Sequence, residues 1–203
     1  MIFKEVRIMK YIIGLSLLFV LFSCGPKAFV KGDYEDPQKQ NLLNDEWSET
    51  DMQVIVKSLT ESIIAHPAIA NAKTPPKLMF TKIQNKTSDH VDTMSIIDMF
   101  RVEMMQTGKV SFINKEARED VADEYNYQNS GMVSAETKKS AGGQIGADYI
   151  VDGRLDSITQ TVDKDKTVYY KLTLILTNLK TNEMVWSNHK EIRKKFKKKT
   201  LGL

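Results

Sequence analysis

The chain has 203 residues, of which 41% are hydrophobic and 27% are charged, and its formal net charge is +3. This make-up is that of an ordinary soluble domain, and the length predicts one hydrophobic core and excludes two. Cys24 is the only cysteine in the sequence, which excludes an internal disulfide.

The first segment predicts export from the cytoplasm. Lys10 precedes an apolar run over residues 11–22. This run is shorter than the roughly 20 residues of a transmembrane helix but suits the apolar region of a signal peptide. We therefore expect residues 1–23 to be a signal peptide, with translation starting at Met1 or at Met9.

The end of that segment predicts a lipid anchor. Residues 21–24, Leu-Phe-Ser-Cys, resemble a bacterial lipobox in which Cys24 accepts the lipid. The alternative is that Cys24 merely ends an apolar segment. The residue after Cys24 is Gly25 and not an aspartate. By resemblance to known sorting signals, this predicts that the anchor goes to the outer membrane.

A flexible tether is predicted for residues 24–44, which are rich in Pro, Lys, Asp and Gln and show little periodicity. Fully extended, this segment would reach about 70 Å. The folded domain is therefore expected to begin near residue 45 and to stay close to its membrane.

The first helix is expected to begin within residues 48–51, with Thr50 and Gln53 as a capping box or with Ser48 as the cap. Pro67 would end it. Its apolar side chains recur at helical spacing and would face a sheet; they are Met52, Ile55, Leu59 and Ile63.

A strand over residues 77–83 and a second helix come next. Asn85 is expected to be a turn residue whose side chain bonds the local backbone. Asp89 or Asp92 would cap the second helix and Gly108 would end it. The apolar stripe of this helix is Met94, Ile97, Phe100, Met104 and Met105.

Three shorter elements are expected before the final strands. Residues 109–114 predict a strand, and residues 115–127 predict a peripheral helix that is charged over most of its surface. Residues 134–145 predict a further helix, which Gly146 would end.

Residues 146–192 predict three consecutive antiparallel strands, with breaks at residues 163–166 and 180–182. In the middle segment every second residue is apolar, which is the period of a strand with one buried and one solvent-exposed face. These residues are Val168, Tyr170, Leu172, Leu174 and Leu176. The predicted fold class is α/β: a single domain over residues 45–192, with a mixed sheet of about five strands that ends in this meander and is covered by helices.

No catalytic, cofactor or metal site is predicted. His66, His90 and His189 lack a second ligand at a suitable spacing. Asp152 and Asp156 share a strand face at about 13 Å, wider than the separation that glycosidases use. The glycine-rich residues 142–147 would follow a helix, whereas a phosphate-binding turn follows a strand.

Positive charge is concentrated at the C-terminus. The predicted signal peptide holds three cations and one anion, so the mature chain carries +1 and, without the six cations of the tail, about −5. Residues 193–203 are expected to be a basic tail that attracts an anionic surface, or else a frayed, solvated terminus. The export signal argues against nucleic acid as the partner. The tail cations are Arg193, Lys194, Lys195, Lys197, Lys198 and Lys199.

Four segments occur in the same order as in a known family. They are residues 83–87 (IQNKT), 108–113 (GKVSFI), 145–155 (IGADYIVDGRL) and 169–187 (YYKLTLILTNLKTNEMVWS). With them, residues 45–192 resemble the penicillin-binding protein activator lipoproteins of the LpoB type. The domain of that family is similar to the amino-terminal domain of TolB and to the curli-secretion lipoprotein.

The resemblance implies a function. We expect a lipoprotein of the outer membrane, facing the periplasm, that has no enzymatic activity and binds a bifunctional peptidoglycan synthase to stimulate it. The matching segments are fold determinants, so they do not identify the residues that bind the partner. The alternative is an envelope assembly or secretion lipoprotein akin to the curli-secretion component. Such a protein would form rings through extra membrane-inserting strands, for which the chain has no spare segment, and a monomer is expected.

Overall fold

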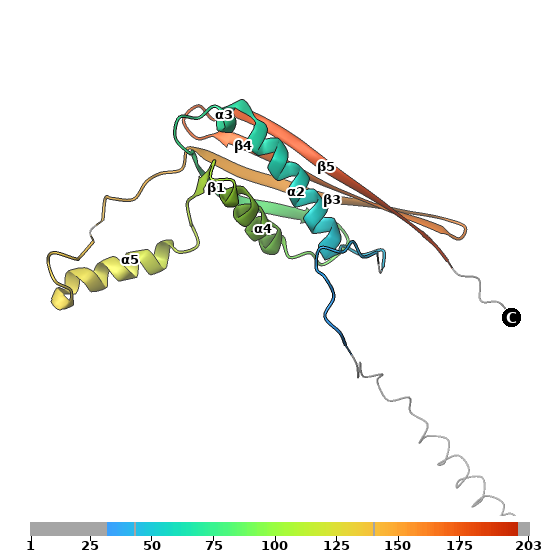
Figure 1. The fold of residues 1–203 in the computed structure, drawn as a ribbon, viewed down its shortest axis with the longest axis horizontal. Helices are drawn as coiled ribbons and strands as arrows, with labels where there is room; N and C mark the ends of the chain where they lie inside the picture. The colour runs from blue at the N-terminus through green and yellow to red at the C-terminus, as the bar shows by residue number, and fades with distance from the viewer. Residues whose placement is uncertain (1–31, 43, 140, 199–203) are drawn as a thin grey trace, which may run out of the picture. The chain divides into compact units, whose positions relative to one another are not determined.

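The structure is a computed structural model that describes residues 32–42, 44–139 and 141–198 (Figure 1). The chain divides into two units, Met1–Pro37 and Gln38–Leu203. In the first unit, the described residues 32–37 contain no helix or strand. The predicted signal peptide and its lipid attachment site, Cys24, lie outside the described residues.

Five strands form one mixed sheet in the second unit: β1 (Lys77–Lys86), β2 (Ser111–Phe112), β3 (Tyr149–Val162), β4 (Asp165–Asn178) and β5 (Met184–Lys197). Their order in the sheet is β2-β1-β3-β4-β5. Strand β1 is parallel to β2 and β3, whereas β3, β4 and β5 are antiparallel neighbours. The predicted mixed sheet ending in a three-stranded meander is confirmed.

The first turn of the meander is tighter than predicted. Val162 pairs with Asp165, so the turn consists of Asp163 and Lys164. Asp163 takes the left-handed φ of 53°, which aspartate tolerates better than most residues. The predicted break at residues 163–166 is too long, because Asp165 and Lys166 already pair with β3.

Strand β5 continues past residue 192, where the domain was predicted to end. Each residue from 193 to 197 has a partner in β4. Backbone pairing does not depend on the charge of a side chain, and β4 is long enough to supply partners over this whole stretch. The predicted basic tail is therefore a strand as far as Lys197, and Lys199 lies outside the described residues.

The helices of the described residues are α2 (Glu49–Ala65), α3 (Pro67–Ala70), α4 (Thr93–Gln106) and α5 (Arg118–Tyr127), followed by the π-helical turn η1 (Gln128–Met132). Ser48 caps α2, and its Oγ accepts the Asp51 N–H at 3.3 Å. The Asp51 carboxylate accepts the Ser48 N–H in return at 3.0 Å. This capping box confirms Ser48 as the cap, and the proposed pairing of Thr50 with Gln53 was wrong.

The folded unit also begins earlier than predicted. The backbone N–H of Asn41 donates to Thr50 Oγ1 at 3.0 Å, so the last part of the predicted tether, residues 24–44, is attached to the start of α2.

Asp92, and not Asp89, caps α4, because its carboxylate accepts the Met94 N–H at 2.9 Å. Gly108 follows the helix at a φ of 67°, as expected for a helix stop. The predicted apolar stripe is confirmed in part. Ile97, Phe100 and Met104 are buried together with Ile96, whereas Met94 and Met105 are exposed.

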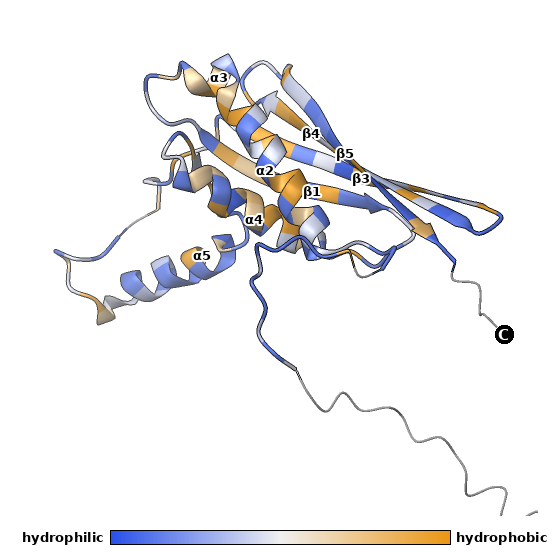
Figure 2. Ribbon diagram, turned by 45° about the vertical axis from the view of Figure 1, so that its right-hand side comes forward, coloured by the Kyte–Doolittle hydropathy of each residue, from blue (hydrophilic) through white to orange (hydrophobic). Residues whose placement is uncertain are grey.

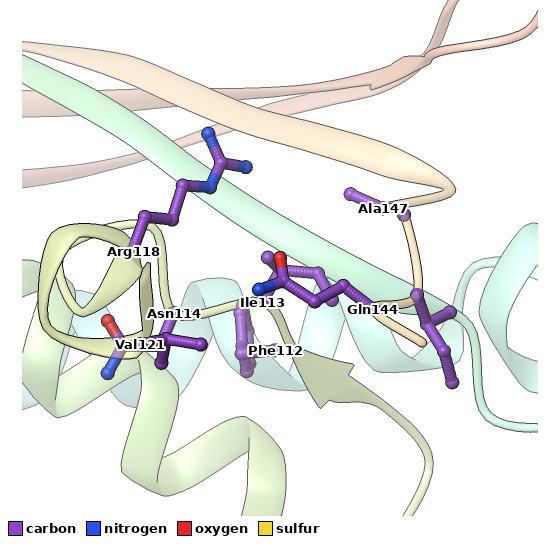
Figure 3. A pocket seen from close by; sticks show the side chains of 9 residues that line it. Phe112, Ile113, Asn114, Arg118, Val121, Gln144 and Ala147 are labelled. Carbon is purple, nitrogen blue, oxygen red and sulfur yellow. The ribbon is translucent and has the colours of Figure 1, made fainter. Parts of the chain in front are cut away.

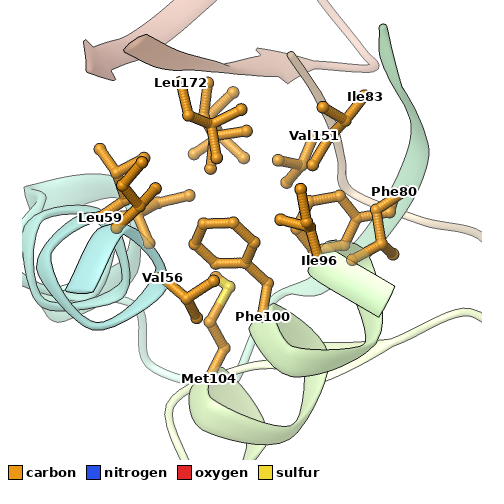
Figure 4. Packing of buried hydrophobic residues seen from close by; sticks show 14 of the residues in the cluster. Val56, Leu59, Phe80, Ile83, Ile96, Phe100, Met104, Val151 and Leu172 are labelled. Atoms are coloured by element: carbon orange, nitrogen blue, oxygen red, sulfur yellow. The ribbon is translucent and has the colours of Figure 1, made fainter. Parts of the chain in front are cut away.

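Helices α2 and α4 cover one face of the sheet and form the core with it (Figure 4). Phe100 of α4 lies against Phe80 of β1, with ring centroids 5.9 Å apart. The period-two prediction for β4 is confirmed, because all five of its predicted apolar residues are buried. They are Val168, Tyr170, Leu172, Leu174 and Leu176.

Two predictions between α4 and β3 fail. The expected strand over residues 109–114 is reduced to Ser111–Phe112, and the helix expected over residues 134–145 does not form in its described residues. Gly142 has a φ of +97°, which a right-handed helix cannot contain, and the segment has no apolar face to bury. Helix α5 is present but mostly hydrophilic (Figure 2), and it has no buried residue.

A substitution at Gly153 in β3 tests how closely β3 and β4 are packed. A Cβ atom at this position would lie 2.5 Å from the Thr173 carbonyl oxygen and 2.6 Å from Leu174 Cδ2. We expect Gly153→Ala to lower the free energy of unfolding by about 1–3 kcal/mol, the usual cost of overpacking, in urea titrations followed by circular dichroism. Gly143→Ala is the matched control, because a Cβ at Gly143 meets no atom within 4 Å. Equal stabilities of the two variants would contradict the packing described.

Candidate docking surface

The second face of strands β3–β5 carries no helix that packs on it among the described elements. We call this side of the three strands the open face. The β4 side chains that point to it are all half-buried, in contrast to their buried neighbours. These residues are Thr167, Tyr169, Lys171, Thr173, Ile175 and Thr177.

A chain of contacts fixes the centre of the open face. The Tyr169 hydroxyl donates to Glu191 Oε1 at 2.6 Å, and His189 Nε2 lies 3.4 Å from the same oxygen. The Arg193 guanidinium lies over the Tyr169 ring, 6.0 Å from its centroid. The hydrogen bond from Tyr169 lowers the pKa of Glu191, and the carboxylate in turn raises the pKa of the Tyr169 hydroxyl.

Strand β3 adds charges beside this chain. Arg154 Nε lies 3.0 Å from Asp156 Oδ2, and Asp156 stands opposite Lys171 in the register of β3 with β4. Asp152 is on the same face, as predicted, and partial burial raises its pKa against the opposing effect of Lys82. The centre of the open face thus combines an aromatic ring with paired charges of both signs.

This face is slightly hollowed. A depression of about 700 Å³ lies over its outer half. Its lining residues are Ile158, Gln160, Thr167, Tyr169, Lys171, Glu191, Arg193 and Lys195. A mixed, aromatic and hollowed surface of this kind suits contact with another protein.

A second hollow, of about 450 Å³, lies between the end of β2, α5 and the segment before β3 (Figure 3). Phe112, Ile113 and Val121 give it apolar walls. Arg118 borders it, with Nη2 at 3.5 Å from Met79 Sδ. The hollow could take an apolar side chain, but it belongs to a part of the chain with few buried residues.

The opposite side of the sheet holds a buried ion pair that the sequence did not predict. Lys194 is 4% exposed, and its Nζ lies 2.7 Å from Asp51 Oδ2. The same ammonium donates to the Glu46 carbonyl oxygen and lies 5.2 Å from the centroid of the Tyr170 ring. Lys194 therefore cannot take part in binding an external anionic surface, and its inclusion among the available tail cations was wrong.

Further contacts hold the segment before α2 against β4. The Tyr170 hydroxyl donates to Asp89 and, at 3.3 Å, to the Asp45 carbonyl oxygen. The Trp47 ring packs edge-on against the Tyr170 ring, with centroids 5.4 Å apart, and the backbone N–H of Trp47 donates to Asp89 Oδ2 at 3.2 Å. Burial and the Asp89 carboxylate raise the pKa of Tyr170. Lys166 pairs with Asp45 and thereby lowers the pKa of that carboxyl group.

The other sequence candidates stay apart. His66 caps α3, where its Nδ1 accepts the Ala68 N–H at 3.3 Å. Asn85 bonds the local backbone as predicted, but the prediction that it is a turn residue was wrong, because β1 continues past residue 83 and Asn85 pairs with Leu155. Within residues 32–42, 44–139 and 141–198, no three His, Cys, Asp or Glu side chains gather as metal ligands would. Over the same ranges, none of the helices combines the length and apolar character that crossing a bilayer demands.

Comparison with known proteins gives a family match. A family model described as peptidoglycan-synthase activator LpoB matches residues 51–192, more than half of the chain. Among curated proteins there is no match.

Solved structures are similar at low identity. The LpoB C-terminal domain from Salmonella enterica is 14% identical, with a TM-score of 0.45, over 70% of this chain and 98% of that one. The same domain from Escherichia coli is 12% identical, with a TM-score of 0.44 and the same coverage. Lipoprotein GNA1162 from Neisseria meningitidis is 13% identical, with a TM-score of 0.38, over 60% of this chain and 84% of that one.

The buried ion pair predicts a large difference between two cations of β5 that lie three positions apart. Lys194→Met would leave Asp51 buried without its partner, and we expect the free energy of unfolding to fall by about 3–5 kcal/mol. Lys197→Met removes an exposed charge and should change it by less than about 0.5 kcal/mol. Chemical denaturation of both variants measures the difference, and a similar effect in both would show that Lys194 is not buried as described.

The contact between Tyr169 and Glu191 predicts a change in titration. In Tyr169→Phe the carboxylate loses its hydrogen-bond donor, so the pKa of Glu191 should rise toward its ordinary value. In the wild type, Glu191 therefore keeps its charge to a lower pH, and the contact is lost as the pH falls through its depressed pKa. NMR titration of the Glu191 carboxyl group measures this, with Tyr127→Phe as the control. An unchanged pKa in Tyr169→Phe would exclude the contact.

Proposed function

The chain belongs to the LpoB family of peptidoglycan-synthase activators, because the family model matches residues 51–192, and on this basis we propose that the protein binds a peptidoglycan synthase and activates it. The matched region runs from the first turn of α2 into β5 and so includes the helices, the sheet and most of the open face. We propose that the protein has no catalytic activity of its own and regulates cell-wall synthesis through contact alone.

We place the protein in the outer membrane, lipid-anchored at Cys24 and facing the periplasm. The lipobox at residues 21–24 supports this placement. Acyl chains contribute about 0.8 kcal/mol per buried CH₂, enough in combination to hold a soluble domain at a bilayer. Because Asn41 is already attached to α2, little chain is left as a free tether. The synthase must then reach toward the outer membrane to make contact.

The open face is the docking surface we propose for the synthase. Tyr169 and Arg154 are residue types that dominate binding energy at protein interfaces. Tyr169 is held in place by Glu191, and Arg154 by Asp156, so little side-chain freedom is lost on binding. The helices pack on the other side of the sheet, so this surface stays open to solvent among the described residues.

Activation requires more than binding. A ligand shifts an equilibrium only by its difference in affinity for the two states. The open face must therefore bind the active conformation of the synthase more tightly than the resting one, and a tenfold preference corresponds to about 1.4 kcal/mol.

A reconstituted assay tests this proposal. Purified synthase polymerises lipid II with and without the protein, and we expect the rate to rise only when both are present; the protein alone should form no glycan strands. Lys171→Glu reverses a charge at the centre of the open face and should weaken the activation at least about tenfold, as loss of an interfacial charge pair does. Lys57→Glu, on the exposed side of α2, is the matched control.

The outcomes separate two claims. No stimulation by the wild-type protein, and no synthase recovered with it from detergent-extracted membranes, would exclude the proposed function. Full stimulation by Lys171→Glu and by Tyr169→Ala would leave the function standing and exclude the open face as the site of contact.

A further inference from the structure

The three strands of the meander extend beyond the helices that cover the sheet (Figure 1). We call this extension the ribbon; it consists of residues 158–169 and 193–198. Its inner side is held by the segment before α2, through the pair of Lys166 with Asp45, and by the first turn of α2, through the pair of Lys194 with Asp51. Its outer side continues the open face and carries no such cover among the described residues.

Strand register sorts the side chains on that outer side by chemistry. Ile158 of β3, Tyr169 of β4 and Arg193 of β5 form one row across the three strands. Two further rows follow toward the tip: Gln160, Thr167 and Lys195, then Val162, Asp165 and Lys197. Strand β5 thus contributes a cation to every row, and β3 contributes an apolar residue to the first and the last.

The apolar members are unusually open to solvent. Ile158 is 57% exposed and Val162 is 69% exposed. A single exposed apolar side chain is ordinary on a protein surface, so the relevant observation is that Val162 shares its row with Lys197.

The charge of the ribbon is strongly one-sided. Residues 158–169 and 193–198 contain seven cations and two anions. Lys195 is paired with Asp165 at 2.9 Å, and two more cations, Lys166 and Lys194, are neutralised on the inner side. Arg193, Lys197 and Lys198 make no ion pair among the described residues.

We propose that the tip of the ribbon, on the outer side around Val162 and Lys197, binds the surface of a bilayer that contains anionic phospholipids, which leaves Tyr169 and the rest of the open face to the synthase. Cations and exposed apolar side chains in one plane match the boundary between phosphate head groups and acyl chains. An acidic protein surface would complement the cations but would give the exposed side chain of Val162 no apolar partner. The chain's own lipid anchor, which belongs to the proposed function, supplies the proximity that such a weak contact needs.

Vesicle binding of protein without acyl chains tests the ribbon independently of the anchor. The chain from residue 24 onward, with Cys24→Ser, is sedimented with phosphatidylcholine vesicles that contain or lack phosphatidylglycerol. We expect binding only to the anionic vesicles, and we expect it to weaken as salt is raised. Lys197→Gln combined with Lys198→Gln should reduce binding at least about tenfold, since each cation near a charged membrane contributes about fivefold.

Lys57→Gln combined with Lys180→Gln removes two exposed cations elsewhere and should bind like the parent. Val162→Asp should weaken binding without a change in the cations. Equal binding to neutral and anionic vesicles, or full binding by the Lys197→Gln/Lys198→Gln variant, would overturn the proposal. A third outcome is that the parent protein does not bind vesicles and that the Lys197→Gln/Lys198→Gln variant fails to activate a synthase. The ribbon would then be a protein contact, and the membrane assignment would be wrong. Vesicle binding without any activation would instead leave the ribbon standing and remove the proposed function.

Discussion

The buried pair of Lys194 with Asp51 sets the arrangement on which the rest of the domain depends. It joins the first turn of α2 to the end of β5, across 143 positions of sequence. A buried ion pair adds little net stability, because removing both charges from water offsets their attraction. The pair instead selects one register of β5 over the alternatives. A slip of β5 by one residue would turn Lys194 to the open face and strand the Asp51 carboxylate in the interior. The register of β5, and with it the composition of both faces, is fixed by this contact.

That register separates the two tasks of the sheet. The inner side is used for packing: Phe80, Phe100 and three leucines of β4 form an apolar core with the helices, and these leucines are Leu172, Leu174 and Leu176. The open face keeps its aromatic and charged groups in contact with water, where Glu191 positions Tyr169 and Asp156 positions Arg154. An activator needs such a surface more than it needs a reactive group, because its effect on the partner comes from binding alone. The family match and the geometry are consistent in this respect.

Local patterns in the sequence predicted much of this fold but little of the site. The alternation over residues 168–176 identified β4 and its buried side, because that signal depends on neighbours two positions apart. The last part of β5 was not predicted, because the run of cations after Ile192 has the composition of a solvated tail. The helix expected over residues 134–145 does not form in its described residues, because Gly142 and Gly143 disfavour a helix and no apolar face compensates for them. The partners of Lys194 and Tyr169 lie on other strands or helices, and no short-range pattern could have indicated them.

Strand β5 is the outermost strand of the sheet. Such a strand has one row of backbone N–H and C=O groups without a partner strand, and an edge of this kind can template fibrillar association between molecules. Arg193, Lys195 and Lys197 stand at alternate positions along it, so two copies approaching edge to edge would bring like charges together. Repulsion of this kind is a known safeguard against aggregation, and it matters most where many copies meet at high local density.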